Sequence, residues 1–275
     1  SRRTSWGPSW LAVLAVAAAG CAGPPSPGPA TSPAAVASAP VARPTPSQPP
    51  SAPRLAGADF ADDARLLHRV LACAGDEPLP AALDAGVVAA HCARLQPWLD
   101  GYRQRHAQVV APYLARLRPA GLPPAVVYPF GGGDLSSALA TYPDAGEYST
   151  LSLELAGDPR RLAHLDAASL QASLGLIRAT IAPLLTRDNS TTENLMKGQR
   201  GDIPGQLGFF VVALAAHGHE PVHVRYFRVE NDGSLHYYDA AEIDAGDATT
   251  ARTLRGRWAP PDFAPVFANV EIAFR

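Results

Sequence analysis

The stretch "VVYPFGGGDLSSALATYPDAGEYSTLSLEL", Val126–Leu155, decides the fold class that this sequence predicts. It opens with a short run of β-branched and aromatic residues, which is typical of a strand, and "GGGD" interrupts that run. "LSSALATYP" continues with a helical pattern, and Asp134 stands at the position of an N-cap. Residues 147–155 alternate as a strand does, and we expect this strand to lie parallel to the first. The sequence therefore predicts a βαβ unit.

Amphipathic helical patterns precede the βαβ unit. Apolar residues recur at helical spacing in three stretches, 59–75, 81–95 and 98–117. Pro97 separates the second stretch from the third, and Pro112 predicts a kink within the third. The interspersed arginines are expected on a solvated face: Arg94, Arg103, Arg105, Arg116 and Arg118. These stretches predict a helical hairpin or small bundle over residues 57–119.

Further helical and strand patterns follow the βαβ unit. A long helix is predicted over 166–185, a short one over 190–197, and a buried helix over 206–216 between glycines. Two β-rich runs around "ENDGS" predict a hairpin. Residues 266–275 predict a last strand, which indicates either an edge strand or missing C-terminal sequence. We therefore expect an α/β domain over 120–275, with a Rossmann-like, partly parallel sheet preceded by the α-helical hairpin.

Residues 1–20 have the pattern of a cleaved signal peptide. Arg2 and Arg3 form a positive region, and the apolar run that follows is too short to span a bilayer core of roughly 30 Å. "AAGC", Ala18–Cys21, resembles a bacterial lipobox, which implies a lipid such as palmitate on the Cys21 thiol and a membrane anchor. By the sorting rule that such signals follow, Ala22 favours the outer membrane. The alternative is an ordinary signal peptide cut nearby, with Cys21 lost or left as a free thiol.

A Pro/Ala/Ser-rich tract follows, and 11 of the 28 prolines lie between residues 22 and 56. Such a tract cannot bury enough apolar surface to offset its ordering entropy, so we expect an extended tether. Residues 1–20 hold two of the 23 basic side chains, so the chain without them has 21 basic and 25 acidic side chains, a net charge of −4. This balance gives no reason to expect nucleic acid as a partner. Besides the membrane, we keep an envelope protein as a candidate partner.

Cysteine usage predicts a disulfide. Of the three cysteines, Cys21 is assigned to the lipid, which leaves Cys73 and Cys92 on consecutive predicted helices. An envelope compartment is oxidising, so these two can clamp a helical hairpin. A bridge over a loop of this length stabilises by roughly 3 kcal/mol in the chain-entropy model. The alternative is a pair of buried thiols.

His219, Glu220 and His223 follow the order H-E-x-x-H, the signature of zinc metalloproteases. Two histidines with this spacing reach one zinc when they share a face of a helix. Pro221 would break a helix, and the segment enters a strand, where residues four apart are separated by roughly 13 Å. We therefore expect no metalloprotease and no metal site here. His217 and His219 are expected as solvated loop residues, with adventitious metal binding as the alternative.

The βαβ unit has the layout of a nucleotide-binding fold, with a glycine-rich turn before a helix and an acid near the end of the second strand. It looks like the first half of a class I S-adenosylmethionine methyltransferase more than a dehydrogenase, because "GGGD" lacks the third glycine of G-x-G-x-x-G. The candidate ligand-binding residues are Gly131, Gly132, Gly133, Asp134 and Glu154. Such cofactors are held in the cytoplasm and this chain is predicted to be exported, so we expect no cofactor. The alternative interpretations are a tight turn, a helix cap and an exposed acid.

"YPFGGGDLSSALATYPDAGEY", and less clearly "GQLGFFVVALAAHGHEPVHVRYFRV", resemble an uncharacterised group of bacterial envelope proteins with a recurring Tyr-Pro-Phe, glycine, aspartate turn. The resemblance covers Pro123–Tyr238 and implies an envelope setting, without an activity or catalytic residues. Ser136 and Ser137 follow the turn but have no evident histidine partner in sequence, and there is no G-x-S-x-G motif. We therefore expect a lipid-anchored binding or structural module rather than an enzyme. A Rossmann-like small-ligand binder or transferase is the alternative.

Overall fold

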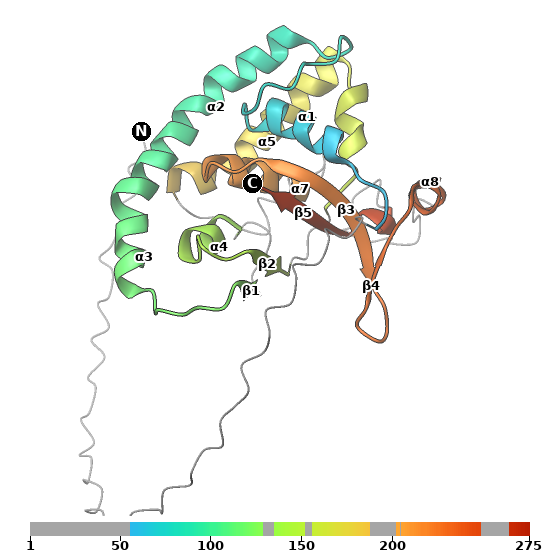
Figure 1. Ribbon diagram of the computed structural model, residues 1–275. Coiled ribbons are helices and arrows are strands. Elements are labelled where there is room, and N and C mark those ends of the chain that lie inside the picture. Colours follow the sequence, from blue (N-terminus) through green and yellow to red (C-terminus); the bar gives the residue numbers. More distant parts are fainter. Residues whose placement is uncertain (1–55, 129–134, 152–155, 188–201, 204, 249–263) are drawn as a thin grey trace, which may run out of the picture. The chain divides into compact units, whose positions relative to one another are not determined.

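The computed structural model describes residues 56–128, 135–151, 156–187, 202–203, 205–248 and 264–275 (Figure 1). The part from Pro53 to Arg275 forms one compact unit. Several predictions fall outside the described residues: the signal peptide, Cys21, the tether, the short helix over 190–197, the "GGGD" turn and Glu154.

The described chain begins with helices. α1 spans Ala61–Leu71 and α2 spans Ala85–Arg105. α2 continues through Pro97, so the predicted break at this proline is wrong. A proline inside a helix removes one backbone hydrogen bond. Leu95 and Leu99, on either side of it, are fully buried, and this packing holds the helix together across the proline.

The kink predicted at Pro112 takes the form of a π-helical turn, η1, over His106–Val110. Pro112 has no N–H to donate, and the Ala111 amide donates to the His106 carbonyl, one residue further back than in an α-helix. α3 (Ala111–Leu117) then continues the helix. The proline thus shifts the helical register without ending the helix.

A disulfide joins Cys73 to Cys92 and confirms the predicted pairing. It connects the residue that follows the α1 C-cap to α2. Cys73 lies in the left-handed region with φ of 56°, a conformation that glycine usually adopts after a helix. The Ala74 amide donates to the His68 carbonyl at 3.3 Å, as in a Schellman-type helix end. The disulfide therefore fixes a tight helix end.

The predicted βαβ unit is confirmed. β1 (Ala125–Tyr128) and β2 (Glu147–Thr150) pair in parallel, with Val126 opposite Tyr148. α4 (Leu135–Thr141) lies between them in the chain. The described residues therefore have a mixed helix and strand fold that includes a parallel strand pair.

Two apolar helices follow. α5 (Ala167–Arg187) and α7 (Gly205–Ala216) confirm the helices predicted there, and a short 3₁₀ turn, η3 (Pro159–His164), precedes α5. The predicted apolar stripe of α5 is buried: Leu170, Leu174, Ile177, Ile181 and Leu184. By length and composition α5 is also apolar enough to cross a membrane, but 44% of its most apolar window is buried inside the unit. A single helix of this kind is weak evidence for a membrane span, because the core helix of a soluble protein passes the same test.

The predicted hairpin and last strand form a second sheet, of order β4-β3-β5. β3 (Pro221–Val229) pairs antiparallel with β4 (Leu235–Tyr237) and with β5 (Asn269–Phe274). Within the described residues β5 lies at the sheet edge. α8 (Ala240–Ala248), which the sequence analysis did not predict, and the 3₁₀ turn η4 (Pro265–Phe267) lie between β4 and β5 in the chain.

The largest hydrophobic cluster is shared by α1, α2, α5 and α7. The helices expected as a separate hairpin therefore share their core with helices of the α/β part. Buried His91 links three of these helices, because its Nε2–H donates to the Leu71 carbonyl at 3.0 Å and Arg178 donates to its Nδ1 at 2.8 Å. A smaller cluster packs Leu139 of α4 against Phe210 of α7. α4 is thus fixed next to α7, and this packing positions the site described below.

Candidate functional site

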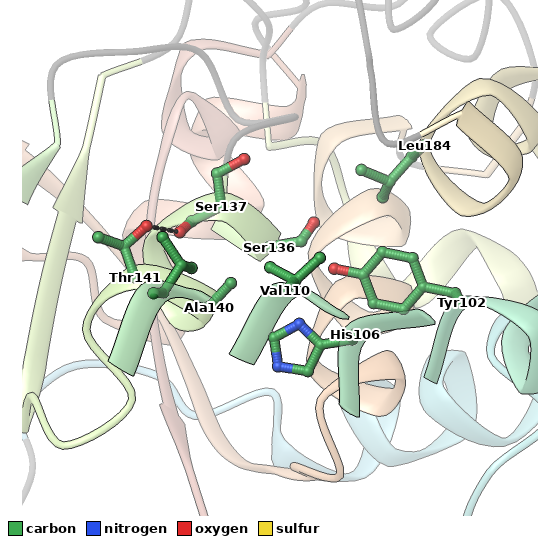
Figure 2. Close-up of a pocket in the computed structure, with 9 residues that line it drawn as sticks. Tyr102, His106, Val110, Ser136, Ser137, Ala140, Thr141 and Leu184 are labelled. Atoms are coloured by element: carbon green, nitrogen blue, oxygen red, sulfur yellow. Dashed lines mark hydrogen bonds between the residues drawn. The ribbon is translucent and has the colours of Figure 1, made fainter. Parts of the chain in front are cut away.

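A cavity of about 170 Å³ lies between the helix α2–η1–α3 and α4 (Figure 2). Tyr102, His106, Val110 and Leu114 form one wall, at steps of four residues. In an α-helix each such step rotates the side chain by about 40°, so three steps would turn it well away from the wall. The wider π turn offsets part of this rotation. Pro112 therefore helps to place these four side chains on one wall.

The opposite wall comes mainly from α4, and Leu184 of α5 completes the lining. Ser136 is only 2% exposed, and its Oγ has no hydrogen-bond partner in the structure. Its neighbour Ser137 is exposed, and Thr141 Oγ1 donates to the Ser137 carbonyl at 2.7 Å. Since buried polar groups are nearly always paired, the Ser136 hydroxyl is the unusual group of this wall.

A hydrogen bond of 2.9 Å joins the Tyr102 hydroxyl to His217 Nε2, behind the first wall. The ring of His217 also lies against that of His106, with centroids 4.7 Å apart. Burial, together with the neighbouring rings of His106 and His219, lowers the pKa of His217 to about 3. His217 is therefore a neutral, partly buried imidazole, and its prediction as a solvated loop residue is wrong.

Three of the arginines expected on a solvated face instead donate hydrogen bonds that join the helices around the cavity. Arg103 donates to the Ala215 carbonyl at 2.9 Å, and Arg105 donates to the Leu185 carbonyl at 2.6 Å. Arg118 donates to the Thr141 carbonyl at 3.0 Å, which joins the two walls of the cavity. The prediction of a solvated face is therefore wrong for these three, because each guanidinium finds a backbone carbonyl of a neighbouring helix.

The candidate ligand-binding residues of the sequence analysis lie outside the described residues: Gly131, Gly132, Gly133, Asp134 and Glu154. Described residues lie close to them in the chain. Ser136 stands two residues after Asp134, and Ala156 stands two residues after Glu154. The Leu207 amide of α7 donates to the Ala156 carbonyl at 3.1 Å. That set of ligand-binding residues therefore stays a prediction.

The H-E-x-x-H residues take separate partners. Pro221 begins β3, which confirms that the segment enters a strand. The His219 ring packs against Phe274, and His223 Nδ1 lies 2.5 Å from an Asp59 carboxylate oxygen. Among the residues that the structure describes, no three His, Cys, Asp or Glu side chains are grouped so as to hold a metal ion. His219 and His223 therefore make separate contacts, with Phe274 and Asp59, and do not share one face of a helix as a zinc-binding H-E-x-x-H motif requires.

Sequence reasoning missed Tyr102 and His106 as site residues and set Ser136 aside for lack of a histidine. His106 lines the same cavity opposite α4 (Figure 2), but the Ser136 Oγ has no hydrogen-bond partner among the described residues, so the two side chains do not form a nucleophile–base pair. The sequence did carry one signal: side chains that line the cavity are spaced four residues apart from Tyr102 to Leu114, and Pro112 lies between the last two of them. That spacing points to one helix face but does not say what packs on it.

Comparison with known proteins adds no relative: no protein-family model, no curated protein and no solved structure matches the chain.

Proposed function

We propose that this chain is an envelope lipoprotein whose folded part binds a small molecule in the cavity between α2–η1–α3 and α4. The observation that carries the proposal is the buried hydroxyl of Ser136, a residue of the cavity wall, which has no hydrogen-bond partner among the described residues. An unpaired buried polar group costs roughly 1–3 kcal/mol. A ligand that forms a hydrogen bond with this hydroxyl would offset the cost. This is the reason to look for a ligand here.

The lipoprotein part of the proposal is supported by the sequence. The signal-like residues 1–20, the lipobox-like Ala18–Cys21 and the Pro-rich tract after them fit export, lipid attachment at Cys21 and tethering to the outer membrane. The resemblance of Pro123–Tyr238 to bacterial envelope proteins supports the same location. Labelled palmitate incorporated by the wild-type chain and not by Cys21→Ala would support it; equal labelling would contradict it.

We also propose a Rossmann-like topology around β1, α4 and β2. Its support is the parallel pairing of β1 with β2 across an intervening helix. In open sheets of this kind, ligands bind beyond the carboxyl ends of the strands, where α4 begins. The cavity runs along one face of α4, from Ser136 in its first turn to Thr141 at its last residue, so its near end lies toward the carboxyl end of β1.

A thermal-shift screen of the full-length protein tests the binding proposal. A ligand at 100 times its dissociation constant adds about 2.7 kcal/mol, which is roughly 5–10 °C for a domain of this size. A ligand of the cavity shifts the wild-type protein and the Ser149→Ala control, whose changed residue is exposed on β2 outside the lining, and does not shift a cavity-filling Ala140→Phe variant that is folded. A ligand that shifts Ala140→Phe equally binds elsewhere and would refute the proposal.

A further inference from the structure

The structure assigns a ligand class to this cavity: a neutral, ring-sized group with one hydroxyl, of which phenol is the simplest example. The inference rests on the proposed binding function and adds to it the chemistry of what is bound. It follows from three properties of the lining, namely its volume, its charge and its hydrogen-bonding groups.

Volume sets the size of the bound group. The cavity holds about 170 Å³, and a cavity of about 150 Å³ is enough to take a benzene ring. The apolar part of the lining comes from Val110, Leu114, Ala140 and Leu184, and the ring of His106 adds an aromatic surface. A six-membered aromatic ring therefore matches both the size and the surface of the cavity.

Charge disfavours an ionic group beside the described lining. Among the residues that the structure describes, none of those lining the cavity carries a carboxylate, an ammonium or a guanidinium group. A buried ion without an opposite charge is strongly disfavoured. Tyr102 and His106 are the titratable side chains of the lining, and Tyr102 already shares a hydrogen bond with His217. The lining thus favours a neutral ligand over a carboxylate or an amine.

Hydrogen bonding sets the substituent. The Ser136 Oγ has no partner, and a serine hydroxyl both donates and accepts. The other α4 hydroxyls of the lining are used differently, because Ser137 is exposed and Thr141 donates to a backbone carbonyl. A hydroxyl on the ligand can donate to or accept from Ser136. A site that pairs with a ligand hydroxyl rejects the analogue without it, because the buried serine is then left unpaired.

The test compares phenol, benzene and benzoate on the full-length protein by ligand-observed NMR titration. We expect phenol to bind about tenfold or more tightly than benzene, because benzene leaves the serine unpaired. Benzoate, which carries a charged carboxylate in place of the hydroxyl, is expected to bind more weakly than phenol. In Ser136→Ala the order reverses, and benzene binds at least as tightly as phenol. The control Ser149→Ala removes an exposed hydroxyl of β2 that does not line the cavity, and it keeps the wild-type order.

The outcomes separate this inference from the function on which it rests. If none of the three probes binds and the thermal-shift screen also finds no ligand of the cavity, the proposed function fails. If benzene binds the wild-type protein as tightly as phenol, or if Ser136→Ala keeps the preference for phenol, the assigned hydroxyl is wrong while binding stands. If benzoate binds more tightly than phenol, the assignment of a neutral ligand is wrong.

Discussion

Replacing Ser136 by alanine should stabilise the unliganded protein. The Ser136 Oγ is buried without a partner, and leaving such a group unpaired costs about 1–3 kcal/mol. Alanine removes the hydroxyl, keeps the Cβ and favours the helix by a few tenths of a kcal/mol. We therefore expect the free energy of unfolding to rise by about 2 kcal/mol. For a folded part of this size, that corresponds to a melting temperature about 4–8 °C higher.

Urea denaturation and calorimetry of wild type, Ser136→Ala and Ser137→Ala measure this effect. Ser137 is on the same helix with the same propensity change, but it is exposed, so its variant should stay within about 0.5 kcal/mol of wild type. The gain in Ser136→Ala should come with weaker binding of a hydroxyl-bearing ligand, which is the trade-off that a binding site predicts. If Ser136→Ala loses 1 kcal/mol or more, its hydroxyl has a partner in the folded protein and the reasoning is refuted.

Three further predictions concern stability. Replacing Cys73 and Cys92 together by alanine should lower the free energy of unfolding by roughly 3 kcal/mol in urea titrations, and a reductant should then have no further effect. Burial lowers the pKa of His91 to about 4, so the unfolded chain takes up a proton near pH 6.5 and the folded protein does not. His91 should thus contribute a loss of about 3 kcal/mol between pH 6.5 and pH 4, to which His217 adds, and His91→Gln should make this part of the pH profile shallower; an unchanged slope would contradict it. Both amide atoms of Gln206 are buried without a partner, so Gln206→Met should raise the unfolding free energy by about 1–3 kcal/mol, and a loss would show that the amide is paired.

The elements with strong local patterns were predicted from the sequence. The apolar stripe of α5, the glycine-bracketed α7 and the hairpin of β3 and β4 each depend on residues close in the chain, and all three are confirmed. The disulfide was predicted because two cysteines remained once Cys21 was assigned to the predicted lipobox. Local rules therefore suffice where the local pattern and the packing agree.

The predictions that failed depend on tertiary packing. Pro97 breaks a helix by local rules, yet buried leucines on both sides carry α2 through it. His217 lies in the short turn between α7 and β3, yet Tyr102, over 100 residues earlier in the chain, packs against it and forms a hydrogen bond with it. Neither contact leaves a trace in the neighbouring sequence.

The sequence contains the residues of both cavity walls but does not predict that the walls meet. The four-residue spacing from Tyr102 marks one wall, and Ser136 follows the glycine turn, but nothing in the sequence shows that the two segments face each other. That contact is set by the packing of α4 on α7 and by Arg118, which donates to the Thr141 carbonyl across the walls. The candidate residues of the "GGGD" turn and Glu154 remain untested predictions.

A crystal structure of the protein soaked with phenol tests the central claim most directly. The account predicts one phenol in the cavity, with its ring against His106 and Leu184 and its oxygen within hydrogen-bonding distance of Ser136 Oγ. Phenol bound only at other surfaces, with the cavity empty in crystals that hold it elsewhere, would contradict the claim that this cavity is a binding site.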